Sequence, residues 1–87
     1  MDPRLVQLSR MLGVPLETPA DARAAVASSP APLAEALVLE ASASDDVTSP
    51  SSAADYLETR LTYLGDLVPP DAVPAIRDHF ARATANW

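Results

Sequence analysis

The chain contains no cysteine, and all six of its basic residues are arginine. Without thiols, it can form neither disulfide bridges nor thiolate metal sites. Without lysine, it can neither form a Schiff base with a carbonyl substrate nor supply the lysine of a Walker-type phosphate loop. These absences exclude several classes of enzyme before any motif is considered.

Positive charge is scarce as well. Twelve acidic residues against six basic ones give a formal net charge of −6 at pH 7. Sequence-independent binding of nucleic acid depends on cationic contacts to phosphate, so the composition argues against a direct nucleic-acid partner. Rows of carboxylates could mimic nucleic acid, but here they occur at predicted helix starts and in loops, mixed with arginine.

Long apolar runs are missing. No apolar run exceeds four residues, as at 36–39, whereas a membrane-spanning helix needs roughly 20. Residues 1–4 do not begin a basic region followed by an apolar one, so no secretory signal is expected. We therefore expect a cytoplasmic protein with no membrane partner. Arginine as the only basic residue besides histidine, together with abundant alanine and proline, is typical of a GC-rich bacterial or phage genome.

The 87 residues, 48% of them hydrophobic, suffice for one small domain spanning 1–87. Aromatic residues make up only 5% of the chain, and no segment alternates apolar and polar residues over the length of a strand. Helix start and stop signals are frequent instead. We therefore expect an all-α fold of four to five short helices.

Three helices are predicted in the first half of the chain. Asp2 is placed to cap the first, and Gly13 to end it. Thr18 is placed to cap the second, with Asp21 at the position of a capping-box acid. A third helix is expected over about 29–43. It is apolar around much of its circumference, which predicts either a central position or a second partner.

A Ser/Asp/Pro-rich stretch at 42–52 reads as a linker between two helical halves, 2–43 and 52–87. Ser52 is predicted to cap the fourth helix. Asp71 is predicted to cap the fifth, which would continue to the last residue. Each half is expected to form a helical hairpin.

Apolar residues on the last helix suggest a contact surface. Its line runs through Val73, Ile76, Phe80, Ala83 and Trp87. Ile76 and Phe80 are also expected to pack in the protein's own core, and core packing is the alternative reading for the Ala83–Trp87 end. A terminal tryptophan frays unless something holds it, and tryptophan is a favoured interface anchor. Leu39 lies outside the main apolar stripe of the third predicted helix, and Tyr56 and Tyr63 flank the apolar line of the fourth. The predicted partner-binding residues are Trp87, Ala83, Phe80, Leu39, Tyr56 and Tyr63.

Signals for catalysis or for a bound cofactor are weak. His79 is the only histidine, and a general base also needs a nucleophile and an orienting group in a pocket. The densest acids, at 45–46, 55 and 58, do not have the ligand spacing of an EF-hand. No metal, cofactor or catalytic residue is therefore predicted.

The sequence thus favours a non-catalytic interaction protein, a small acidic accessory subunit or adaptor that binds a larger protein, or another copy of itself, through apolar helix faces. A phage-encoded protein, either a virion connector component or an inhibitor of a host defence complex, is the alternative. A small enzyme using His79 is a third, weaker reading.

Overall fold

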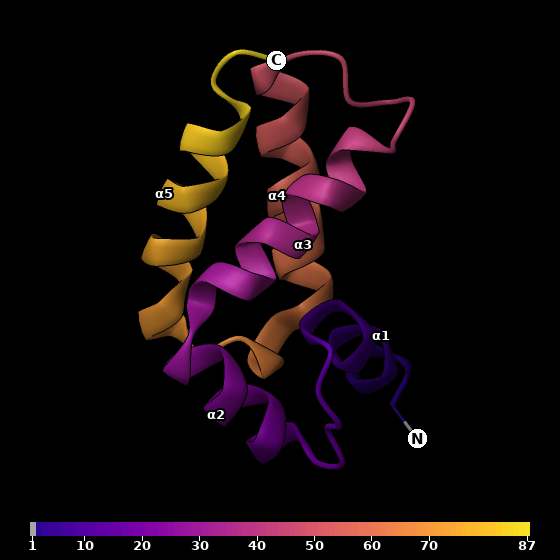
Figure 1. Cartoon of the computed structure of the whole chain (residues 1–87), viewed down its shortest axis with the longest axis vertical. Coiled ribbons are helices and arrows are strands. Elements are labelled where there is room, and N and C mark those ends of the chain that lie inside the picture. The colour runs from indigo at the N-terminus through magenta and orange to yellow at the C-terminus, as the bar shows by residue number, and fades with distance from the viewer. Residues whose placement is uncertain (1) are drawn as a thin grey trace.

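A computed structural model describes residues 2–87, and the regular secondary structure over that range is helical, with no strand. The molecule measures 35 × 23 × 20 Å. The presence of helices and the absence of strands among residues 2–87 confirm the predicted all-α class (Figure 1). The α-helices are joined by turns and by two short 3-10 helices, in the order α1 (Pro3–Leu12), α2 (Pro19–Ser28), α3 (Pro30–Ser42), α4 (Pro50–Leu64), η1 (Gly65–Leu67), η2 (Pro70–Ala72) and α5 (Val73–Thr84).

The first two helices begin at the predicted caps. The Asp2 carboxylate accepts a hydrogen bond from the Arg4 backbone amide at 2.9 Å. The Thr18 hydroxyl and the Asp21 carboxylate form the reciprocal bonds of a capping box. At the end of α1, Gly13 adopts the left-handed conformation with φ 70°. Each cap satisfies backbone groups that the helix itself leaves unpaired, so the signal is local and is readable from sequence.

The fourth helix begins earlier than predicted. Its cap is Ser49, not Ser52, and Pro50 occupies the first helical position. The Ser49 hydroxyl accepts from the Ser52 amide at 3.2 Å, and the Ser52 hydroxyl accepts from the Ser49 amide at 3.0 Å. Proline suits a first turn because its missing N–H is not needed there. The connection between the two halves therefore spans 43–49 rather than 42–52.

The fifth helix is shorter than predicted at both ends. Asp71 lies within η2 and makes no capping hydrogen bond. Pro69 is held extended by the proline that follows it, and the chain turns through a bond from the Ala72 amide to the Pro69 carbonyl before α5 begins. The helix ends at Thr84, so the expectation that it continues to Trp87 is wrong.

Helix α3 is the centre of the core. It packs most extensively against α5 and also contacts α1, α2 and α4 (Figure 1). Four α3 residues are buried, namely Leu33, Ala34, Leu37 and Ala41. The halves on either side of 43–49 therefore do not pack as separate hairpins, because α3 makes its main contact across that division.

Candidate functional site

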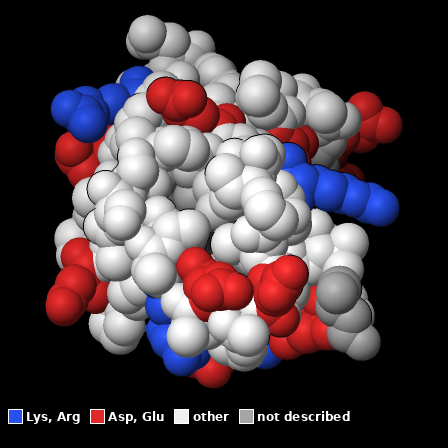
Figure 2. All heavy atoms as spheres, turned by 60° about the horizontal axis from the view of Figure 1, so that its bottom comes forward, with Lys and Arg blue, Asp and Glu red and all other residues white. Residues whose placement is uncertain are grey.

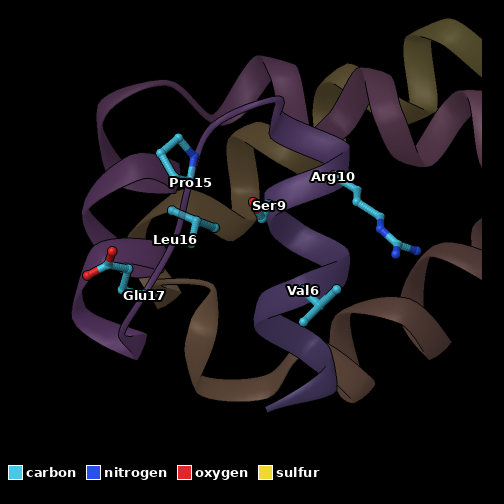
Figure 3. A pocket seen from close by; sticks show the side chains of 6 residues that line it. All are labelled: Val6, Ser9, Arg10, Pro15, Leu16 and Glu17. Atoms are coloured by element: carbon cyan, nitrogen blue, oxygen red, sulfur yellow. The ribbon is translucent and has the colours of Figure 1, made fainter. Parts of the chain in front are cut away.

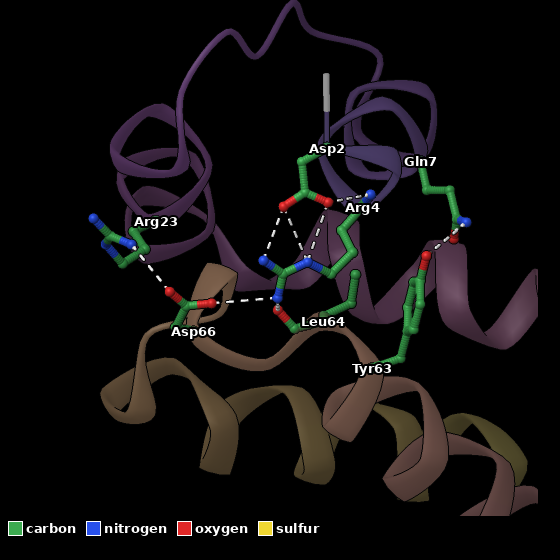
Figure 4. A network of polar contacts seen from close by, with 7 residues as sticks. All are labelled: Asp2, Arg4, Gln7, Arg23, Tyr63, Leu64 and Asp66. Atoms are coloured by element: carbon green, nitrogen blue, oxygen red, sulfur yellow. Dashed lines mark hydrogen bonds and ion pairs between the residues drawn. The ribbon is translucent and has the colours of Figure 1, made fainter.

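A polar network joins the N-terminal helix to the turn that follows α4 (Figure 4). The Arg4 guanidinium donates to the Asp2 carboxylate at 2.9 Å, to the Leu64 carbonyl oxygen at 3.2 Å and to the Asp66 carboxylate at 3.3 Å. Asp66 also lies 3.9 Å from Arg23 of α2. The Arg4 hydrogen bonds join α1 to η1, and the longer, exposed pair of Arg23 with Asp66 adds only a weak contact with α2. We interpret the network as structural.

Two carboxylates owe a lowered pKa to arginine partners, and this predicts how stability varies with pH. Hydrogen bonds from the Arg4 side chain and then from its backbone amide lower the pKa of Asp2. The Arg77 side chain, at 2.7 Å and 2.9 Å, lowers the pKa of Glu58. A lowered pKa in the folded state means that the stabilisation is present above the ordinary carboxylate pKa, near about 4, and is lost as the pH falls through the folded value.

We expect the free energy of unfolding to decrease as the pH is lowered from about 5 toward about 2. The double variant Asp2→Asn, Glu58→Gln should show a flatter decrease, because neither amide takes up a proton in this range. Urea unfolding followed by circular dichroism at a series of pH values measures both curves. Parallel curves for the variant and the parent would contradict the assignment.

A second polar cluster includes both tyrosines predicted to bind a partner. The Tyr56 hydroxyl donates to the Glu40 carboxylate at 3.3 Å, and burial is the main cause that raises the pKa of Tyr56. The Arg60 guanidinium donates to the Gln7 side chain at 2.8 Å and lies 5.1 Å from the centre of the Tyr63 ring. The Gln7 side-chain amide of α1 also donates to the Tyr63 hydroxyl at 3.4 Å, so both tyrosines join α4 to neighbouring helices. Tyr63 is nevertheless 41% exposed, so its role in binding a partner stays a prediction.

A hollow of about 360 Å³ lies beside α1 and the loop after it (Figure 3). Among its lining residues, only Leu16 is buried, with 7% of its surface exposed. Arg10 and Glu17 also line it, but Figure 3 shows these two charged side chains pointing away from one another. Because its polar groups do not converge on one point, this hollow lacks the arrangement expected of a ligand or catalytic site.

A more apolar groove of about 300 Å³ lies between α3 and α5. We call it the α3–α5 groove, and its lining residues are Glu35, Val38, Leu39, His79 and Ala83. Leu39 is 70% exposed, the highest value among the exposed large hydrophobic side chains within residues 2–87. The fold thus brings together two of the predicted partner-binding residues, Leu39 and Ala83, from segments far apart in the sequence.

Phe80 does not belong to this surface. It is 1% exposed and is the largest fully buried side chain in the described part of the chain. The buried line on α5 continues from Ile76 and Phe80 to Thr84, whose hydroxyl donates to the Phe80 carbonyl oxygen at 2.9 Å. A spacing of four residues keeps these positions on one face, whereas Ala83 is exposed. The sequence pattern continues the apolar line through Ala83 rather than Thr84, because threonine is polar.

Trp87 lies outside α5, in a terminal turn where its amide donates to the Thr84 carbonyl oxygen at 3.1 Å. It is 38% exposed and is not one of the groove's lining residues. The predicted partner-binding residues are therefore distributed over several surfaces and the core. Only Leu39 and Ala83 lie in one groove.

Charge and metal-ligating groups are dispersed. Over residues 2–87, no group of three or more His, Asp or Glu side chains is arranged to hold a metal ion. On the face shown in Figure 2, acidic side chains occur in several places, some of them side by side near the lower middle of the view, and arginines lie around them. Within the same described range, none of the helices is long and apolar enough to cross a membrane.

No family model, curated protein or solved structure matches this chain. The α3–α5 groove, with its exposed Leu39, is the candidate binding site.

Proposed function

We propose that this protein is a non-catalytic interaction module, a small acidic accessory subunit or adaptor that binds a larger protein through the α3–α5 groove. The supporting observation is the exposure of Leu39 inside a groove that Val38 and Ala83 also line. A single exposed leucine is ordinary on protein surfaces. An exposed leucine within a hollow, flanked by apolar groups from two helices, is typical of sites that receive an apolar side chain.

The composition of the groove favours binding over catalysis. His79 lines it, and Glu35 is the other titratable residue there. Val38, Leu39 and Ala83 supply no nucleophile and no side-chain hydrogen-bond donor. General acid–base catalysis needs a reacting group and an orienting partner positioned together, and apolar neighbours provide neither.

A Leu39→Ala variant tests the proposal. Truncating an apolar anchor is expected to cost about 1–2 kcal/mol of binding free energy, roughly a tenfold increase in Kd. The fold should be almost unaffected, with a change within about 0.5 kcal/mol, because the side chain is largely in solvent. The measurement is quantitative mass spectrometry of proteins captured by the parent and the variant from extracts of the source cells, followed by titration of the purified partner.

Val14→Ala is the matched control, because Val14 is 41% exposed but does not line the groove. We expect it to retain the partner that Leu39→Ala loses. Equal capture by all three proteins would contradict the proposal. A His79→Gln variant that folds and binds normally but loses biological activity would favour an enzyme instead.

A further inference from the structure

We infer that the segment received by the α3–α5 groove is a basic amphipathic helix, with an apolar anchor and an arginine or lysine one turn away that pairs with Glu35. This inference rests on the proposed function, because it specifies the partner of the same groove.

The first argument is the unpaired charge of Glu35. Among residues 2–87, Glu35 forms neither an ion pair nor a side-chain hydrogen bond, although it lines the groove. Most of the protein's arginines already have carboxylate partners within 4 Å, namely Arg4, Arg23, Arg60, Arg77 and Arg82. Arg82, on the same helix as His79 and Ala83, is held by Asp78 at 3.1 Å. The groove therefore presents a negative charge that the chain itself does not neutralise.

The second argument is the spacing along α3. Glu35 and Leu39 are four residues apart, so they lie on the same side of the helix and about 6 Å apart along its axis. A partner helix lying along the groove repeats its side chains with the same rise. A partner whose apolar and basic residues are one turn apart can therefore place the apolar residue beside Leu39 and the basic residue beside Glu35.

Charge also distinguishes this occupant from the others. Nucleic acids and anionic lipid surfaces carry the same sign as the protein, whose net charge is −6. A second copy would bring an equally acidic molecule to the groove. A two-fold pairing through this face would also bury both Glu35 side chains in a single interface. A basic helix is the partner whose charge complements the groove.

The experiment is an NMR titration of the full chain with designed peptides. The probe is a blocked, alanine-rich helical peptide of about 16 residues, with one central leucine and arginine four residues before and after it. A second peptide replaces both arginines with glutamate, and a third replaces the leucine with alanine. We expect saturable shifts of the amides of Val38, Leu39, His79 and Ala83 with the first peptide. At low salt, its binding should be about fivefold tighter than that of the glutamate peptide. The alanine peptide should give no saturable shift.

A charge exchange identifies the residue responsible. Glu35→Arg should reverse the preference between the arginine and glutamate peptides. Glu17→Arg, which changes the net charge equally but lies outside the groove, should leave the preference intact. If the groove requires leucine but binds both charged peptides equally, this inference is wrong while the proposed function stands. Groove shifts absent with every peptide would also overturn it. So would a dimer in light scattering that Leu39→Ala dissociates. The capture experiment with Leu39→Ala decides the proposed function independently.

Discussion

Phe80→Ala is expected to lower the free energy of unfolding by about 3–5 kcal/mol, because it removes a buried aromatic ring and leaves a cavity. Phe80 is 1% exposed and lies on the buried face of α5, the helix that makes the largest contact with α3. A chain of 87 residues has a total stability of only about 4–13 kcal/mol on a per-residue basis. The loss is therefore a large part of the whole, and urea unfolding followed by circular dichroism measures it.

Phe80→Leu is the comparison variant, because it keeps most of the buried apolar volume that Phe80→Ala removes. It retains an apolar side chain and should cost considerably less than alanine, about 1–2 kcal/mol. Leu39→Ala truncates a side chain that is 70% exposed, so it should leave the free energy of unfolding almost unchanged. If Phe80→Ala instead kept the parent's stability and lost only partner binding, Phe80 would be the surface residue that the sequence pattern suggested.

Gly65→Ala is expected to have the second large effect, a loss of about 1–3 kcal/mol from backbone strain. Gly65 follows α4 with φ 55° and ψ −126°, a combination that residues with a Cβ rarely adopt. A Cβ built at this position would lie 3.3 Å from the Arg4 Nη1 atom. That atom donates to the Leu64 carbonyl oxygen and to Asp66, so its displacement would also weaken the contact between α1 and η1.

Gly13 provides the matched control. It has a positive φ of 70° but a ψ of 25°, which is the ordinary left-handed region, and a Cβ there would meet nothing within 4 Å. Gly13→Ala should cost about 1–2 kcal/mol, and Gly13→Asn less, because asparagine tolerates this conformation. Gly65→Asn should not recover stability in the same way. Urea midpoints for the four variants test the contrast, and a recovery of stability by asparagine at both glycines would contradict it.

The start of a helix is predictable from sequence where a single capping residue bonds to the backbone of its near neighbours. Asp2 and Thr18 were read correctly because a cap bonds to an amide two or three residues ahead. Ser49 was missed because Ser49 and Ser52 both stand before an apolar run, and both take part in the cap. The sequence predicts a cap at Asp71, because nothing in the neighbouring residues indicates that the chain first forms a 3-10 turn after Pro69.

By itself, the sequence determined the all-α class, most of the helix boundaries and the absence of thiol and lysine chemistry. These depend on composition and on interactions within a few residues. Only the tertiary structure decided that α3 packs mainly on α5, that Phe80 points into the core and that Leu39 shares a groove with Ala83. Which helix faces meet depends on the combined burial of many apolar groups along the whole chain. The α3–α5 groove consequently has no local signature, and its two halves become neighbours only when the core has formed.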